Sequence, residues 1–274
     1  MSLQKRIIKT FDKKGFRWII SLTFKLVSLY KTRTINRFKY DNVNNKWMQF
    51  HQQLCYFIDS KPNWNISLPY LEQYVKATSF IQYHPKEGDT IVDIGAGIGT
   101  ETIIYSMKVG SGKVYAIEAH PETYNKLFLL KTANNFENIT VSNIAISNET
   151  GVIHIESREN HVENSILRDN SNGIPIKAIT LDEYVVENRI KEIDFLKMNI
   201  EGAEVNAIKG MKETISIIDN IAISCHDFLF EKNTTEIKDA VIDFLTKNNF
   251  TVVPQKTGHI VKDSWIYGKK IKES

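Results

Sequence analysis

The sequence predicts an α/β fold built around a Rossmann-like, mostly parallel sheet. From Thr90 onward, apolar strand signals alternate with helical signals, and repeated β–α–β units require parallel strands covered by helices on both faces. A glycine-rich loop, Gly95–Gly99, joins the first strand to the first helix. An acid, Glu118, ends the second strand. This order is typical of a nucleotide-type α/β sheet.

The strands and helices follow from apolar runs, periodicity and breakers. Pro121 suits the first turn of a helix, and the polar segment 157–173 is expected to be a loop. We expect strands at Thr90–Ile94, Lys113–Glu118, Ile139–Ile146, Val152–Glu156, Pro175–Thr180, Ile193–Ile200, Asn220–Cys225, Phe250–Pro254 and Ser264–Tyr267. We expect helices at Gly99–Lys108, Pro121–Asn134, Leu181–Asn188, Ala203–Ile218 and Thr234–Asn248.

The chain divides into a basic, mostly helical N-terminal region, 1–85, and a Rossmann-like domain, 86–274. Tyr70–Tyr83 is expected to be a helix within the first region. Residues 1–40 carry eleven lysines and arginines and one aspartate, a net charge of +10 in a chain whose total is +3. A basic arm on an acidic body suggests an anionic partner for the arm.

Phe16–Tyr30 is the most apolar stretch of the chain and is too short for a confident membrane span. At helical spacing a narrow polar face separates from a broad apolar one. The polar face holds Lys14, Arg17, Ser21, Lys25, Ser28 and Thr32. The helix is expected either to lie in an anionic membrane surface or to dock on the main domain or on a second subunit, as in a homodimer.

Composition excludes several classes of protein. With 42% apolar and 24% charged residues among 274, the chain is neither disordered nor fibrous. Its two cysteines, Cys55 and Cys225, exclude a disulfide framework and a cysteine zinc cluster, and the histidines show no metal-ligand spacing. We expect no metal. Reduced thiols and no clear cleavable signal suggest a cytoplasmic protein, with the basic arm allowing contact with the inner membrane face.

The glycine loop and the acid after it predict an adenosine site. Glu118 lies 19 residues beyond Gly99, where a carboxylate can accept hydrogen bonds from both ribose hydroxyls. The loop is preceded in its strand by Asp93, which would repel a pyrophosphate and favour the ammonium and sulfonium charges of S-adenosylmethionine. The charge pattern therefore favours S-adenosylmethionine over NAD.

The runs IVDIGAGIGTET, KVYAIEAHPETYNKL, NITVSNIAISNETG, ITLDEYV and IDFLKMNIEGAEVNAIKG resemble the FkbM-type methyltransferases over Thr90–Phe228. The resemblance implies a class I methyltransferase sheet with an antiparallel last strand, and S-adenosylmethionine-dependent O-methylation of a sugar, glycan or small-molecule hydroxyl. Positions matching the family's cofactor site are Asp93, Gly95, Gly97, Gly99, Glu118, Asn143 and Ala145.

One position departs from the family pattern. The family usually has K-x-D-x-E-G-x-E, and here Asn199 replaces the aspartate that faces the methyl donor. An amide can hydrogen-bond but cannot act as a base. The catalytic candidates are therefore Asn199, Glu201 and His226, with the acceptor hydroxyl between them and the 157–173 loop, including His161 and Asn164, covering it. The alternatives are helix capping for Glu201 and Glu204 and a surface position for His226.

Three other functions remain open. A non-catalytic cofactor-binding scaffold of the same fold is suggested by Asn199. A nucleic-acid methyltransferase would use the basic arm, but N-I-E-G stands where N-P-P-Y would be expected. An NAD-dependent oxidoreductase is the weakest of the three, for the charge reason given above.

Overall fold

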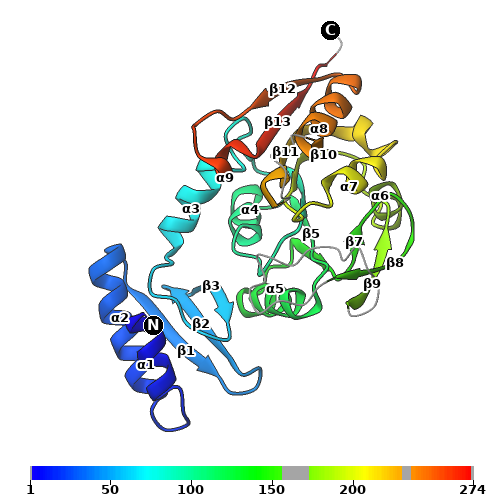
Figure 1. Cartoon of the computed structure of the whole chain (residues 1–274). Coiled ribbons are helices and arrows are strands. Elements are labelled where there is room, and N and C mark those ends of the chain that lie inside the picture. The colour runs from blue at the N-terminus through cyan, green and yellow to red at the C-terminus, as the bar shows by residue number, and fades with distance from the viewer. Residues whose placement is uncertain (1, 156–172, 230–235, 273–274) are drawn as a thin grey trace.

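Residues 2–155, 173–229 and 236–272 are described by the structure, a computed structural model (Figure 1). Within these ranges the largest sheet has seven strands in the order β12-β13-β11-β10-β4-β5-β6. Their bounds are β4 Thr90–Ile94, β5 Lys113–Ile117, β6 Ile139–Ser142, β10 Ile193–Met198, β11 Ile218–Ser224, β12 Phe250–Pro254 and β13 Trp265–Lys270. Strands β6, β5, β4, β10 and β11 pair in parallel, and β13 pairs antiparallel with both β11 and β12. The expected mostly parallel sheet with an antiparallel last strand is confirmed.

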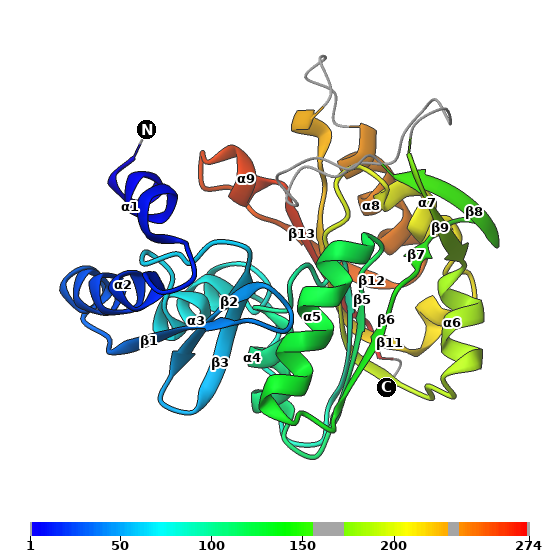
Figure 2. The same ribbon diagram turned by 90° about the horizontal axis from the view of Figure 1, so that it is seen from below.

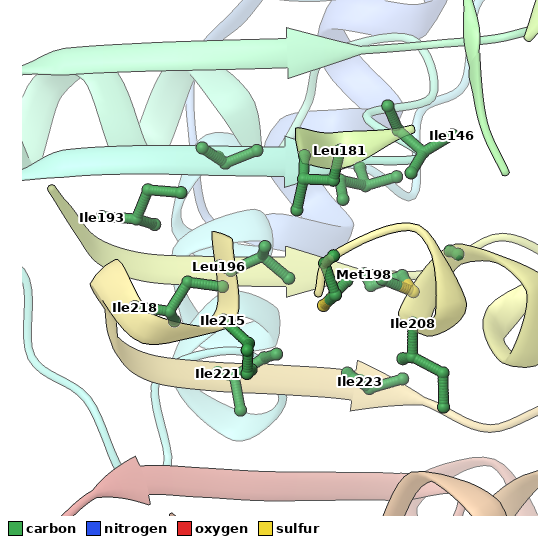
Figure 3. Packing of buried hydrophobic residues seen from close by; sticks show 14 of the residues in the cluster. Ile146, Leu181, Ile193, Leu196, Met198, Ile208, Ile215, Ile218, Ile221 and Ile223 are labelled. Carbon is green, nitrogen blue, oxygen red and sulfur yellow. The ribbon is translucent and has the colours of Figure 1, made fainter. Parts of the chain in front are cut away.

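Helices cover both faces of this sheet because successive strand residues point to opposite sides. On one face, α6 (Leu181–Glu187), α7 (Glu204–Lys209) and α8 (Glu236–Lys247) pack on the strands. Figure 3 shows the aliphatic packing there, with Leu196 and Met198 of β10 among the side chains. The opposite face is covered by α3 (Leu68–Ala77), α4 (Thr102–Val109) and α5 (Pro121–Asn134). The first core is mostly aliphatic, whereas the second also holds aromatic rings such as Phe80, Tyr105 and Phe195. Both pack closely against the strands that carry the site.

The expected strand Ile139–Ile146 is divided at Asn143. Its first part is β6, and its last two residues form β7, Ala145–Ile146, in a separate sheet. That sheet has the order β7-β9-β8, with β8 Gly151–Ile155 and β9 Ile174–Ile179. The side-chain amide of Asn143 donates to the backbone oxygens of Glu118 and Ala119, 2.9 and 2.8 Å away. These two bonds hold the bend against the end of β5.

The expected helix Ala203–Ile218 is wrong beyond Lys209. After α7 the chain turns and makes a short 3-10 helix, Thr214–Ile217, before entering β11 at Ile218. The reason is tertiary: Gly210 lies so close to the carbonyl oxygen of Ser147 that a side chain there would overlap it. Asp182 of α6 then accepts the backbone N–H groups of Glu213 and Thr214, which fixes the turn.

The N-terminal region contains three strands that the sequence analysis did not predict. Helices α1 (Leu3–Phe11) and α2 (Arg17–Thr32) precede β1 (Asn36–Asp41), β2 (Lys46–His51) and β3 (Leu54–Asp59), which pair as an antiparallel meander. Helix α3 follows, shorter than the expected Tyr70–Tyr83, with the Ser67 hydroxyl accepting from the N–H of Tyr70. The description of 1–85 as mostly helical is corrected to a mixed helix-and-sheet extension, because alternate residues such as Phe38 and Trp47 pack inward from strands.

Strand β3 attaches the extension to the main domain. In both views β3 lies beside α5 (Figures 1 and 2). The side chain of Asn134, at the end of α5, accepts from the N–H of Cys55 at 2.8 Å and donates to its oxygen at 2.7 Å. Lys126 of α5 forms an ion pair with Asp59 at 2.8 Å. A side-chain amide thus makes the two bonds that a neighbouring strand would make.

Candidate active site

A cavity of about 510 Å³ lies at the carboxyl ends of β4, β5 and β10, which is where ligands bind in parallel α/β sheets. Residues of the main domain that line it share the strand ends and the loops after them: Ile94, Gly95, Ala96, Gly97, Ile98, Thr100, Glu101, Ile117, Glu118, Ala119, His120, Ile144, Ala145, Ile146, Ile153, Ile155, Lys197, Asn199, Ile200, Glu201 and Ala203. The extension adds Phe57, Asp59, Asn63, Ile66 and Leu71.

The glycine loop folds tightly after β4. Gly95 and Gly97 line the cavity with positive φ angles of 74° and 59°, in the region that favours glycine. A side chain on Gly95 would overlap the carbonyl oxygen of Asn199, so the loop packs directly on the end of β10. Gly99 does not line the cavity; a side chain there would meet Leu127 of α5. Gly99 therefore serves helix packing, whereas Gly95 and Gly97 face the ligand space.

Asp93 is placed behind the loop. Its carboxylate is fully buried, accepts from the Thr102 hydroxyl at 2.7 Å, and has the Lys197 ammonium 3.0 Å away. The same ammonium donates to the Gly95 carbonyl oxygen at 2.8 Å. Burial alone would lower the pKa of Lys197, but Asp93 and Glu101 raise it, so the lysine stays charged. Lys197 neutralises the charge of Asp93. Asp93 therefore does not act on the methyl donor by its charge, as expected from the sequence, but holds Lys197 against the Gly95 loop.

Glu118 lies where the sequence predicts it. Its two carboxylate oxygens accept the backbone N–H groups of Gly97 and His120, at 2.9 and 2.8 Å. Burial raises the pKa of Glu118, although these two N–H groups oppose the shift. A carboxylate has about four acceptor positions, so room remains for two hydroxyl donors. Ala145 lines the same half of the cavity, while Asn143 supports it from behind.

Two candidate catalytic residues, Asn199 and Glu201, line the other half of the cavity. The N–H of Asn199 donates to the Ile94 oxygen at 3.0 Å, and its buried side-chain oxygen has no partner within the structure as described. Glu201 has a φ of 52°, a left-handed conformation that is uncommon outside glycine and concentrates at functional sites. These features place a buried amide oxygen and a left-handed turn at the end of β10, beside the cavity.

His226 is buried behind Glu201 and does not line the cavity. Its Nδ1 lies 2.7 Å from Glu204 Oε1, and its Nε2 lies 3.5 Å from Glu201 Oε1. Glu204 Oε1 also accepts the N–H groups of Ile200 and Gly202, so it caps the turn and holds the histidine. Burial alone would lower the pKa of His226, but the hydrogen bond and charge of Glu204 and the charge of Glu201 raise it. Three residues expected separately therefore form one acid–histidine–acid chain.

Several site residues escaped the sequence analysis. Lys197 stood in the quoted motif LKMNIEGAE, but its bond to the loop needs the fold to be seen. Glu101, which accepts from Tyr105 at 2.8 Å, stood in the quoted run IVDIGAGIGTET but was given no role. The extension residues lie outside the family resemblance altogether. The segment 157–173, with His161 and Asn164, lies almost wholly outside the described residues, so its expected covering role stays a prediction.

The fold and this site define a class I methyltransferase: the sheet order with its inserted antiparallel strand, the glycine loop after β4 and the acid after β5 occur together in that class. The family model of the methyltransferase FkbM domain matches residues 93–252. The chain belongs to the FkbM methyltransferase family. The expected family and its class I methyltransferase fold are confirmed.

A relative and two solved structures give the range of similarity. The hexuronic acid methyltransferase AglP of Haloferax volcanii is 24% identical over 155 residues, 56% of this chain and 62% of that protein. The chain thus spans less than two thirds of that relative. An rRNA methylase from Streptococcus thermophilus has a TM-score of 0.44 at 15% identity, covering 77% of this chain and 98% of that one. The fibrillarin of Aeropyrum pernix, with bound S-adenosyl-L-methionine, has a TM-score of 0.40 at 14% identity, covering 73% of each chain. The fold assignment rests on the strand order and not on these two likenesses.

Proposed function

We propose that this protein transfers a methyl group from S-adenosylmethionine to a hydroxyl of a sugar or glycan. One observation carries the proposal: a single cavity joins the Gly95–Gly97 loop and Glu118 to Asn199, Glu201 and the extension. The Gly95–Gly97 loop and Glu118 form a donor half, which suits an adenosine. Asn199, Glu201 and the extension form an acceptor half. The methyl donor and the acceptor would therefore lie in the same cavity. A volume of about 510 Å³ lies within the usual range for ligand sites.

The donor half fits the methyl donor by its chemistry. Glu118 has acceptor capacity left for two ribose hydroxyls, as described above. Both ring nitrogens of His120, which also lines the cavity, are buried and have no partner among the described residues, and burial lowers the pKa of this histidine. A neutral imidazole can offer one donor and one acceptor to a purine edge or to its bound water. The residues of the donor half therefore suit an adenosine ligand that carries no phosphate or other anionic group.

The reaction needs alignment and the removal of one proton. S-adenosylmethionine supplies a methyl group on a positively charged sulfur, which leaves as a neutral thioether when the acceptor oxygen bonds to the methyl carbon. In our proposal Asn199 hydrogen-bonds the acceptor hydroxyl and Glu201 takes its proton. His226, held by Glu204, lies 3.5 Å from Glu201 and keeps that carboxylate charged and oriented before it accepts the proton. Alignment in the cavity supplies the rest of the barrier reduction.

A sugar is the acceptor class that the acceptor half supports best. Amide and carboxylate groups of Asn63, Asn199 and Glu201 share this half with Phe57 and Ile66. Sugars combine hydroxyl groups with apolar C–H faces, which such a mixed wall can bind. The similarity to a hexuronic acid methyltransferase adds support from an independent direction.

Calorimetry and a transfer assay test the proposal. Calorimetry with S-adenosylmethionine should show binding that Glu118→Ala weakens by about 1–3 kcal/mol, because two ribose hydroxyls lose their acceptor. Glu122→Ala, at an exposed acid in the first turn of α5, is the matched control and should leave binding unchanged. Labelled S-adenosylmethionine should then transfer its methyl group to glycan fractions of a cell extract.

Two results would count against this function. Binding of NAD in place of S-adenosylmethionine would overturn the donor assignment. Binding of the donor with no transfer to any fraction would instead support a non-catalytic scaffold, the alternative suggested by Asn199. Label found in the nucleic-acid fraction would replace the sugar with a polynucleotide.

A further inference from the structure

Helix α2 exposes a row of large apolar side chains. Trp18, Leu22, Leu26 and Leu29 are 64%, 51%, 59% and 41% exposed, and their spacing of four, four and three places them on one side of the helix. We call these four residues the α2 strip. Contiguous exposed apolar surface on a folded protein marks an interaction site, whereas scattered apolar residues need no explanation.

The strip cannot turn inward, because the opposite side of α2 is anchored. Ile20, Phe24 and Ser28 are buried there. The Phe24 ring lies 5.5 Å from that of Phe38 and 4.7 Å from that of Trp64. The Ser28 hydroxyl accepts from the side chain of Asn36 at 2.5 Å. The sequence analysis placed Ser28 on the polar face of this helix, and we expected that face to be exposed. In the structure Ser28 is buried, and the apolar α2 strip lies in solvent instead.

Two positive charges lie beside the strip. Lys25 lies seven residues after Trp18 and four before Leu29, so it shares the exposed side, and Arg33 follows at the helix end; both are exposed. The single acid of residues 1–40, Asp12, is held inward by Arg17 at 2.8 Å and by the Trp47 indole at 3.2 Å. The exposed part of this arm therefore presents cations and apolar groups without an opposing carboxylate.

We propose that the α2 strip binds an anionic phospholipid surface, with α2 lying in the plane of the interface. Apolar side chains would enter the headgroup region while Lys25 and Arg33 meet lipid phosphates, the pattern of an interfacial helix. A second copy of the chain fits less well as the partner. Two N-terminal arms, each with a net charge of +10 over residues 1–40, would then face and repel each other. Within the described residues no helix is long and apolar enough to cross a membrane.

The strip is separate from the active site. None of its residues lines the cavity, and in both views α1 and α2 lie at the end of the molecule away from the seven-stranded sheet, with the N-terminal sheet between them (Figures 1 and 2). Membrane binding can therefore be tested without altering the catalytic machinery, and it does not depend on the proposed reaction.

Flotation of the full chain is the direct test. We expect binding to vesicles of phosphatidylcholine with roughly one-third phosphatidylglycerol, little binding to phosphatidylcholine alone, and release as salt rises. The double variant L22E/L26E should reduce binding by about tenfold or more. Val186→Glu, an equally drastic change at a 75% exposed position of α6, is the matched control and should bind normally.

A second measurement uses Trp18 itself. The other three tryptophans, Trp47, Trp64 and Trp265, are buried, so brominated lipids should quench the emission of Trp18 and not that of Trp18→Phe. Absence of binding to anionic vesicles, binding that L22E/L26E leaves intact, or bound protein without quenching would each overturn the proposal. Concentration-dependent self-association abolished by L22E/L26E, without vesicle binding, would replace the membrane with a second copy.

Discussion

His226 and Glu204 form a buried hydrogen bond of 2.7 Å that joins the end of β11 to the first turn of α7. It places the far nitrogen of the imidazole 3.5 Å from Glu201, which faces the cavity. Glu204 itself does not face the cavity, so we assign it a positioning role.

Once an acceptor is known, His226→Ala and Glu201→Gln should lower single-turnover methylation by about 10²–10⁴-fold, the usual contribution of a general base. The affinity for S-adenosylmethionine should hardly change, because neither residue is assigned to the adenosine. Glu204→Gln should keep part of the rate and shift the pH–rate profile, since it retains a hydrogen bond to the imidazole but removes a charge. Wild-type rates in the first two variants would leave alignment alone as the mechanism.

The raised pKa of His226 predicts a pH-dependent contribution to stability. Because the folded-state pKa exceeds the unfolded value of about 6.5, the protonated imidazole stabilises the native state fully below about pH 6.5. This stabilisation is lost as the pH rises through the folded-state pKa. Urea unfolding should therefore show a difference in free energy between wild type and His226→Gln that shrinks as the pH rises above about 6.5. A difference that grows with pH would contradict the direction of the shift.

Two loop glycines should respond differently to alanine. Gly95→Ala brings a methyl group onto the Asn199 oxygen and should lower the free energy of unfolding by more than about 3 kcal/mol. Gly97→Ala meets no neighbouring atom and should cost only about 1–2 kcal/mol for its left-handed backbone. Denaturant melts of both variants test this order. Equal losses would mean that the close approach of the loop to β10 is absent in solution.

Asn134→Ala should loosen the extension. It leaves the N–H and the oxygen of Cys55 without partners, at about 1–3 kcal/mol for each buried group. Hydrogen exchange should increase in β3 more than in β4. Thr132→Ala, at an exposed position of the same helix, is the control and should leave β3 unaffected.

Asn199→Asp tests the departure from the family pattern. A carboxylate in place of the unpartnered amide oxygen would attract the sulfonium of S-adenosylmethionine but not its neutral demethylated product. The affinity ratio of the two ligands should therefore rise by about tenfold, or roughly 1.4 kcal/mol. An unchanged ratio would show that residue 199 does not face the methyl group. A raised rate of methyl transfer would show that the natural Asn199 weakens the enzyme.

The main domain was largely predictable because its strands are buried on both faces and read as apolar runs. Thr90–Ile94 was predicted with its observed bounds. The strands of the extension were missed because their pattern is only half apolar: β1 reads NRFKYD and β2 reads KWMQFH. Their turns use Asn45 and Gln52 in left-handed conformations, not the Asn-Gly pair that announces a hairpin. The helix ending at Lys209 was overextended because a distant residue, Asp182, captures the N–H groups that would have continued it.

In the candidate site, residue types were predictable and pairings were not. Glu118, Asn199 and Glu201 reach the cavity because they follow parallel strands, which the sequence order implies. The sequence placed Asp93 beside the ligand, but the structure pairs it with Lys197, more than one hundred residues away. Only the three-dimensional register of β4 and β10 brings those two together.

The cavity wall made by Phe57, Asp59, Asn63, Ile66 and Leu71 lies ahead of residue 93, where the family match begins. In the proposed function, part of the acceptor wall is thus encoded ahead of the stretch that holds the methyl donor, whereas Asn199 and Glu201 lie within that stretch. Mutations that reshape the extension could change which acceptor is chosen while the stretch that holds the methyl donor stays intact. We therefore expect that grafting the segment 54–71 from a relative onto this chain transfers part of the acceptor preference without rebuilding the nucleoside site.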